Sequence, residues 1–115
     1  MSEADCLFCK IRDGKIPATI TYRDDDAIAF RDIKPEAPFH ELVIPTRHIV
    51  NVGEASPEDA AILGKLMLVA GERGRASGHP DGFRVIANSG RGAGQTVFHL
   101  HLHVLAGRPL SWPPG

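Results

Sequence analysis

The sequence predicts one mainly antiparallel α+β domain. Its 115 residues are enough for a single hydrophobic core. The expected elements run in the order short helix, strands, long helix, strands, without the regular alternation of strand and helix that builds a parallel sheet. We therefore expect residues 1–115 to form one α+β domain with no linker.

The first half of the chain should contain a short helix and three strands. Asp5 can cap a helix over residues 6–13, and Gly14 is a typical stop. The expected strands are bounded by turn residues or by proline, and they cover residues 19–22, 27–31 and 40–45. The third strand is continuously apolar at its centre, which indicates a mostly buried strand.

The second half should contain one long helix and two further strands. Ser56 is a favourable N-cap, Pro57 is a favourable first residue, and acidic residues follow in the first turn. Apolar residues then recur at helical spacing and should cover a sheet: Ile62, Leu63, Leu66, Met67, Val69 and Ala70. The helix should end near Arg75, and strands should follow over residues 83–87 and 99–105.

Composition and charge exclude several classes of partner. The formal net charge is −1, and there is no basic run or basic helix face, so nucleic acid and membrane surfaces are not expected partners. The first residues lack the positive and apolar regions of a signal peptide, and no apolar run is long enough to span a membrane. We expect a cytoplasmic protein that binds a small ligand.

Three histidines at a spacing of two stand near the end of the chain. On a strand, His99, His101 and His103 lie on one face, and the apolar residues between them lie on the other. Just before them, residues 88–96 form a glycine-rich loop whose backbone N–H groups a phosphate can approach. Imidazoles beside such a loop indicate a chemical site rather than a packed core.

These motifs together resemble those of the histidine triad (HIT) family. The resemblance is carried by QTVFHLHLHVL at 95–105, DIKPEAPFH at 32–40 and LVIPTRH at 42–48. The short length and the ending WPPG are similar to the histidine triad nucleotide-binding branch, the purine nucleoside phosphoramidases. The resemblance implies a HIT-like fold, with a five-stranded sheet and one long and one short helix. It also implies hydrolysis of purine nucleoside 5′-phosphoramidates such as adenosine monophosphoramidate.

The resemblance further assigns catalytic roles. It implies that His101 attacks the α-phosphorus of the nucleotide and forms a nucleotidyl-histidine intermediate, which water then hydrolyses. His103 would contact the phosphate or the leaving group. His40, which matches a fourth histidine of the family's site, would orient His101 and share its proton. The Thr96 hydroxyl would help the leaving group to depart.

A nucleotide site is implied in the same way. Donors for the phosphoryl oxygens would be preorganised in the glycine-rich loop, at Asn88, at the backbone of Gly94 and Gln95, and at the Thr96 hydroxyl. Asp32 would accept hydrogen bonds from the ribose hydroxyls. Four apolar side chains would sandwich the purine: Phe8, Ile11, Phe30 and Ile33. From the residues alone, each of these four is equally well explained as part of the core.

The only two cysteines are Cys6 and Cys9. In a reducing compartment, a Cys-x-x-Cys pair is more typical of metal binding or redox work than of a structural disulfide. The resemblance implies a structural Zn²⁺ held by both cysteines together with His48 and His99, a closed tetrahedral site with no position left for water. The competing interpretation is a pair of free thiols, as in relatives that lack the pair and remain active.

The resemblance implies a homodimer whose two sheets join into one. The tail, residues 108–115, would contact the partner, and Trp112 would approach the partner's site. Other functions stay open from the sequence. They are a dinucleoside polyphosphate hydrolase or nucleotidyltransferase of a neighbouring HIT branch, a nucleotide-binding regulatory or scaffold protein, and a hydrolase in which zinc does the chemistry.

Overall fold

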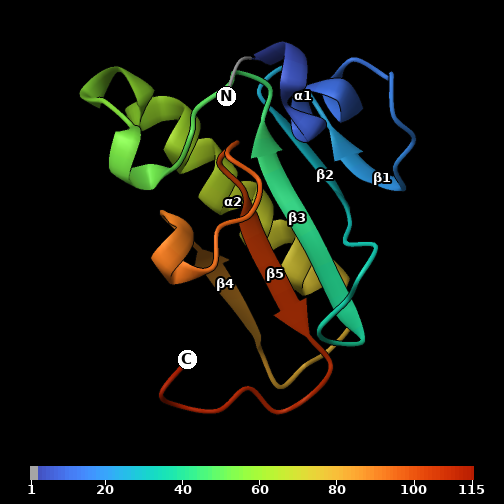
Figure 1. The fold of residues 1–115 in the computed structure, drawn as a ribbon. Coiled ribbons are helices and arrows are strands. Elements are labelled where there is room, and N and C mark those ends of the chain that lie inside the picture. Colours follow the sequence, from blue (N-terminus) through green and yellow to red (C-terminus); the bar gives the residue numbers. More distant parts are fainter. Residues whose placement is uncertain (1–2) are drawn as a thin grey trace.

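The structure, a computed structural model, describes residues 3–115 and contains a five-stranded antiparallel sheet (Figure 1). The strands are β1 (Ile20–Arg23), β2 (Ala27–Arg31), β3 (Phe39–Pro45), β4 (Phe83–Ala87) and β5 (Leu102–Ala106). Their order across the sheet is β1-β2-β3-β5-β4, and all four neighbouring pairs are antiparallel. The helices are α1 (Leu7–Arg12) and α2 (Ala60–Ala76). The predicted α+β fold with one short and one long helix is confirmed.

The two helices cover opposite faces of the sheet (Figure 1). On one face, α2 packs Leu66, Val69 and Ala70 against small and branched side chains: Ala27, Ala29, Val43, Leu100, Leu102 and Val104. On the other face, α1 packs Phe8, Cys9 and Ile11 against Ile28, Phe30, Leu42 and Ile44. Alternate residues of each strand thus point to two separate cores. The second of these faces is called the α1 face below.

Both helices begin differently from the sequence prediction. Asp5 was expected to cap α1, but Cys6 is the N-cap, and its sulfur accepts the N–H of Cys9. The expected start of the long helix at Ser56 is a capping box with Asp59, which opens a short 3-10 turn (Pro57–Asp59) before α2. Met67 is 55% exposed, so its predicted burial is wrong. The buried stripe of α2 is narrower than expected: Leu66, Val69, Ala70 and Gly74 are buried, and Ile62 and Leu63 pack against the core while only partly buried.

The strand predicted over residues 99–105 begins only at Leu102. Leu102 is the first residue of β5, and it has partners on both sides, Val43 on β3 and Ala87 on β4; before it, β4 has already turned away into the glycine-rich loop. Before this point, the N–H of Leu100 donates to the carbonyl of Ile49 in the loop after β3 (2.6 Å). The predicted alternation nevertheless holds: Leu100, Leu102 and Val104 pack with α2, and the three histidines lie on the α1 face.

The C-terminal tail is held by arginine side chains that donate to backbone carbonyls. Arg84 donates to the carbonyls of Leu110 (3.1 Å) and Ser111 (2.8 Å), and Arg108 donates to the carbonyl of Glu36 (2.7 Å). A cavity of about 560 Å³ lies here, lined by residues 79–84 and 107–110, and it contains none of the three triad histidines. Trp112 is 83% exposed. Within residues 3–115, no helix combines the length and the apolar character that crossing a bilayer requires.

Candidate functional site

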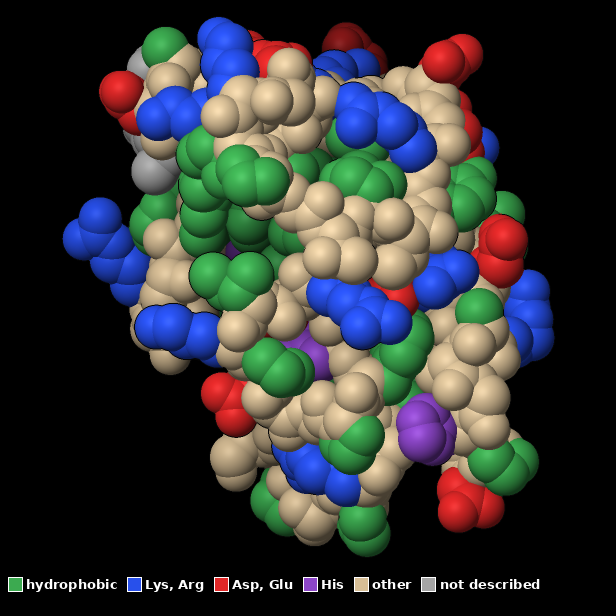
Figure 2. All heavy atoms as spheres, turned by 90° about the vertical axis from the view of Figure 1, so that its right-hand side faces the viewer, with side chains coloured by type: hydrophobic (Ala, Val, Ile, Leu, Met, Phe, Trp, Pro, Cys, Tyr) green, Lys and Arg blue, Asp and Glu red, His purple; other side chains and the backbone are tan. Residues whose placement is uncertain are grey.

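A cavity of about 250 Å³ opens on the α1 face. Figure 2 shows hydrophobic side chains gathered on this side of the molecule, with lysines and arginines around them. The four predicted purine-sandwiching residues, Phe8, Ile11, Phe30 and Ile33, all contribute to its lining, as do the polar residues Asp32, Thr96, His101 and His103. Ile33 is 92% exposed and therefore lies at the rim. The structure brings the predicted base and ribose residues to one hollow with Thr96, His101 and His103, whereas the other predicted phosphate donors, Asn88, Gly94 and Gln95, do not line it.

Other lining residues were not singled out from the sequence. They are Leu7, Ile16, Pro17, Ala18, Arg31, Leu42 and Val97. One of them had a usable signal, because Leu42 stands two residues after His40 on the same strand and so shares its face. Residues 16–18 had no such signal in the sequence, because the position of an irregular connection depends on the helix and the strand that it joins.

The buried ring of His101 is held by a single hydrogen bond to the backbone. Its Nδ1 lies 2.7 Å from the carbonyl oxygen of His99. A carbonyl has no proton to give, so Nδ1–H is the donor, and the neutral ring keeps its lone pair on Nε2. Phe8 packs edge-on against the ring, with centroids 5.1 Å apart. The arrangement fixes both the orientation and the tautomer of His101.

His40 contacts His103, whereas the family resemblance implied that it orients His101. Nε2 of His40 lies 2.9 Å from Nδ1 of His103 and 3.4 Å from Oδ2 of Asp32. The strand register explains the difference. His40 pairs with Leu105 and Leu42 pairs with His103, so His40 and His103 are diagonal neighbours. His101 precedes β5, and its Nδ1 contacts the His99 carbonyl instead.

Burial keeps the two histidines that line the cavity, and the neighbouring His40, neutral. Burial lowers the pKa of His101 and of His40, and the carboxylate of Asp32 only partly opposes this shift at His40. Burial, with the neighbouring His101 and His40, lowers the pKa of His103 to about 4. At pH 7 these imidazoles therefore carry one proton each, and their hydrogen bonds decide which nitrogen holds it.

The side chain of Gln95 holds the glycine-rich loop in shape by hydrogen bonds within the loop and to the segment after β3. The side chain of Gln95 is buried; its amide oxygen accepts from Asn51 and from the N–H of Gly90, and its amide nitrogen donates to the carbonyls of Val50 and Val97. The backbone N–H groups of Gly94 and Gln95 donate to the carbonyls of Arg91 and Gly90, respectively. The loop is thus internally bonded at the two positions predicted as phosphate donors. Thr96 is exposed and lines the cavity, while Asn88 is half-buried and outside its lining.

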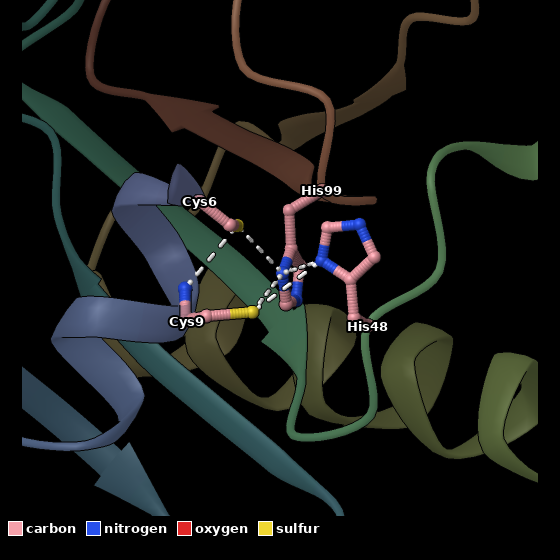
Figure 3. Close-up of side chains that lie close together, drawn as sticks. All are labelled: Cys6, Cys9, His48 and His99. Atoms are coloured by element: carbon pink, nitrogen blue, oxygen red, sulfur yellow. Dashed lines mark hydrogen bonds between the residues drawn. The ribbon is translucent and has the colours of Figure 1, made fainter. Parts of the chain in front are cut away.

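The two cysteines and two of the histidines converge at a second point on the same face (Figure 3). Their ligand atoms all lie within 4.8 Å of one another. The close approaches are Cys6 Sγ to His99 Nδ1 (3.3 Å), Cys9 Sγ to His48 Nδ1 (3.4 Å), Cys9 Sγ to His99 Nδ1 (3.5 Å) and His48 Nδ1 to His99 Nδ1 (3.2 Å). All four residues predicted as metal ligands are therefore brought together.

The protonation states at this point fit a metal ion. His99 donates from Nε2 to the carbonyl of Pro45 (2.9 Å), so Nδ1 presents its lone pair to the cysteines. Burial lowers the pKa of His99 to about 4, so the ring stays neutral as a ligand must. Burial and the neighbouring Cys6 raise the pKa of the Cys9 thiol to about 12. A cation that holds this sulfur as thiolate must supply the compensating charge, and Cys₂His₂ is a donor set that suits Zn²⁺.

An ion pair between a buried carboxylate and a half-buried arginine on the opposite face was not predicted. Glu41 is 2% exposed; its carboxylate accepts two hydrogen bonds from Arg73 of α2 (2.8 and 3.0 Å) and one from Thr21 (2.8 Å). Two features of the sequence could have indicated this ion pair. Glu41 is a charged residue within an otherwise apolar strand, and Arg73 lies on the long helix that covers that strand. The pair ties α2 to β3 directly behind His40.

Comparison with known proteins identifies the family. Residues 13–110 match the model of the HIT domain. An uncharacterised HIT-like protein of Synechocystis is 51% identical over 111 residues, which are 96% of this chain and 97% of the relative. A HIT family hydrolase from Legionella pneumophila has a crystal structure with a TM-score of 0.93 and 44% identity, over 96% of this chain and all of that chain.

A further solved structure bears on the Cys₂His₂ cluster. It is a zinc-bound histidine triad family protein from Mycobacterium smegmatis, with a TM-score of 0.83 and 36% identity, over 93% of this chain and 78% of that chain. The domain match spans most of the sequence, and the curated relative is alike over nearly its whole length. The chain belongs to the HIT domain family.

Proposed function

We propose that this chain hydrolyses purine nucleoside 5′-phosphoramidates through a nucleotidyl intermediate on His101. The observation that carries the proposal is the hydrogen bond from Nδ1–H of His101 to the His99 carbonyl, because it leaves the Nε2 lone pair as the nucleophile. The lowered pKa keeps this ring neutral near pH 7. Similar solved structures described as HIT family hydrolases support a hydrolytic reaction.

The proposed reaction has two displacements at the α-phosphorus. In the first, the His101 Nε2 lone pair forms an N–P bond while the P–N bond to the amine breaks. The amine nitrogen keeps that electron pair and takes a proton from solvent, relayed by the Thr96 hydroxyl. In the second, water attacks phosphorus, the electron pair of the His101–P bond returns to Nε2, and the water's proton returns to solvent. The His99 carbonyl faces the positive charge that the ring carries between the two steps.

The cavity supports a purine nucleotide as substrate. Phe8, Ile11 and Phe30 offer flat apolar contact for the base, with Ile33 at the rim, and Asp32 can accept from the ribose hydroxyls. His103 would contact a phosphoryl oxygen beside His101, since their ring centroids are 4.9 Å apart. Because Gly94 and Gln95 use their N–H groups within the loop, we assign the loop's donors to Thr96 and Asn88 and give Gln95 the role of holding the loop shape.

We propose further that Cys6, Cys9, His48 and His99 hold a structural Zn²⁺. The convergence of their ligand atoms and the His99 tautomer support this assignment. The ion would neutralise two thiolates and cross-link α1 to the loop after β3 and to the residues before β5. All four coordination positions come from the chain, so no reaction step is assigned to the metal.

A homodimer joined along β4 is also proposed. β4 is an edge strand of the sheet, and large apolar side chains on β4 and on α2 are exposed. They are Phe83 on β4 and Met67 and Leu68 on α2, which are 38%, 55% and 73% exposed. A second copy that extends the sheet would cover them and the edge together. Size-exclusion chromatography with light scattering tests the dimer, and Leu68→Glu should shift it toward monomer.

Turnover of three substrates tests the proposed reaction. Adenosine 5′-phosphoramidate, diadenosine triphosphate and diadenosine tetraphosphate would be compared at equal concentration with the purified protein. The proposal expects kcat/KM for the phosphoramidate to exceed that for both dinucleotides by at least about 100-fold, which is about 2.7 kcal/mol of transition-state discrimination. Faster cleavage of a dinucleotide would assign the chain to a different HIT activity. Negligible turnover of all three would favour a binding protein.

A further inference from the structure

We infer that the backbone N–H of Glu36 sets the protonation pattern of the active site, so that His103 presents an N–H and His101 a lone pair to the same ligand. This inference deepens the proposed function, and it names Glu36 as a positioning residue that acts through its peptide group. It also explains why one of two neighbouring histidines is the nucleophile and the other is not.

The first step concerns the Nδ1 side of the His40 ring. The N–H of Glu36 points at Nδ1 of His40, with the nitrogens 3.0 Å apart. A backbone N–H can only donate, so Nδ1 must be the acceptor. A neutral ring then carries its hydrogen on Nε2. The turn that follows β2 thus fixes the tautomer of His40 from outside the cavity.

The other side of the ring gives an independent reason for the same state. Nε2 of His40 has two neighbours, Oδ2 of Asp32 at 3.4 Å and Nδ1 of His103 at 2.9 Å. An unprotonated Nε2 would place its lone pair against a carboxylate, which is repulsive, whereas Nε2–H is attracted to it. Both sides of the His40 ring therefore require the hydrogen on Nε2.

The consequence passes to His103. Because Nε2–H of His40 is a donor, Nδ1 of His103 must accept, and the neutral His103 ring carries its hydrogen on Nε2. Nε2 is then the nitrogen that His103 offers to a ligand in the cavity. His101 is in the opposite state, with its hydrogen on Nδ1 and its lone pair on Nε2.

The two rings therefore have different chemistry at the phosphate. The lone pair of His101 can attack phosphorus, while Nε2–H of His103 is a preorganised donor to a phosphoryl oxygen. A neutral imidazole N–H gives up its proton only to strong base, so His103 stabilises charge and does not serve as the acid for the leaving group. With the opposite tautomer, His103 would point a lone pair at an anionic oxygen.

Histidine tautomers in the ligand-free protein test the inference directly. Long-range ¹H–¹⁵N correlation spectra of ¹⁵N-labelled, zinc-loaded protein at about pH 8 separate the two tautomers of each neutral ring. We expect His40 and His103 as Nε2–H tautomers and His101 as the Nδ1–H tautomer. A His103 ring with its hydrogen on Nδ1 would overturn the inference. This readout does not depend on which substrate is cleaved, so it can fail while the proposed function stands, and the reverse.

Variants of Glu36 then test its role. Glu36→Pro removes the N–H, and Glu36→Ala keeps it and is the matched control. Glu36→Pro should convert His40 and His103 to mixed tautomers and lower kcat about tenfold. In Glu36→Ala, both rings should keep a single tautomer. A folded Glu36→Pro variant that keeps single tautomers would contradict the assignment.

A second pair of variants serves if Glu36→Pro does not fold. His103→Gln retains an N–H donor on a planar group, and His103→Ala removes it. We expect kcat of His103→Gln to exceed that of His103→Ala by about tenfold or more at similar stability. Equal rates for the two variants would show that no donor is needed at this position.

Discussion

The α1 face carries two histidine clusters that differ in how their protons are arranged. In the first, His48 and His99 turn their Nδ1 atoms toward one point, where both cysteine sulfurs also lie. In the second, His40 and His103 are joined in a row, Nε2 to Nδ1. Convergent lone pairs suit a cation, and a row in which each ring accepts at Nδ1 and donates at Nε2 suits hydrogen bonding to an anion.

The backbone makes the difference. The Pro45 carbonyl fixes the hydrogen of His99 on Nε2, so Nδ1 is left as a ligand atom. The Glu36 N–H fixes the lone pair of His40 on Nδ1, so Nε2 is left as a donor. Asp32, His40 and His103 also lie close enough to hold a metal ion, but a metal at Nε2 of His40 would force a hydrogen onto Nδ1, against the N–H of Glu36. Histidine thus serves as a metal ligand where a backbone carbonyl accepts its N–H, and as a hydrogen-bond donor where a backbone N–H occupies its other nitrogen.

The largest expected effect comes from breaking the nucleophile while leaving the metal cluster in place. His101→Ala should lower phosphoramidate turnover by at least about 10⁴-fold, because the covalent route is lost. The same variant should keep its zinc content, since His101 is not a ligand. Steady-state rates and metal analysis on one preparation measure both. Activity within tenfold of wild type would remove His101 from the chemistry.

Breaking the metal cluster should instead affect stability first. Cys9→Ser should abolish zinc binding and lower the melting temperature by about 10 °C, which corresponds to roughly 2 kcal/mol for a domain of this size. His79→Asn is the matched control, because His79 is exposed and belongs to neither cluster. Differential scanning calorimetry measures the shift. An unchanged melting temperature in Cys9→Ser, with wild-type protein shown to contain zinc, would mean that the ion does not stabilise the fold.

The pH dependence of stability tests whether His103 in the second cluster is buried and neutral. The pKa of His103 is about 4 in the folded chain and about 6.5 when unfolded. Below pH 6.5 the unfolded state binds a proton that the folded state does not, so the free energy of unfolding should fall from pH 6.5 to about 4. Urea unfolding across this range measures the slope. His103→Gln should make the slope smaller, and an identical slope in that variant would argue against a buried neutral His103.

The smallest effect on kcat is expected at Arg108, which contacts the second cluster only through Glu36. Arg108 donates to the carbonyl of Glu36, the residue whose N–H holds His40. Arg108→Leu should lower kcat two- to threefold, about the loss of one exposed hydrogen bond. Arg23→Leu is the control, because Arg23 is also exposed and also donates to a backbone carbonyl, that of Arg12. Equal rates for the two variants would show that the contact between Arg108 and Glu36 does not affect catalysis.

Much of this organisation could be predicted from the sequence. The strands, the long helix and the alternation of the histidine row follow from periodicity and turn residues, which act locally. The residues of the nucleotide site and of the metal site were grouped by resemblance to the HIT family, because a family resemblance relates positions that lie far apart in the chain. Spacing alone could not bring Cys6 and Cys9 to His48 and His99, since three separate segments meet there.

Hydrogen-bond partners from the backbone could not be predicted. The Pro45 and His99 carbonyls are present whatever residue stands at those positions, and the N–H at position 36 is present for any residue except proline, so the sequence holds no sign of their roles. The same limit explains why His40 was assigned to His101, because only the register of β3 against β5 decides which ring it meets. Gln95 was placed correctly in the loop but expected to bind phosphate through its backbone N–H, which the loop itself uses.

The nucleotidyl intermediate on His101 offers the most direct test of the account. Wild-type protein mixed with adenosine 5′-phosphoramidate and quenched in base within milliseconds would be digested and examined by mass spectrometry. The account predicts an added adenylyl group on the peptide that contains residues 99–103, localised to His101 by fragmentation and missing in His101→Ala. An adduct on His103, or rapid turnover in which water's oxygen reaches phosphorus with inversion in a single displacement, would contradict it.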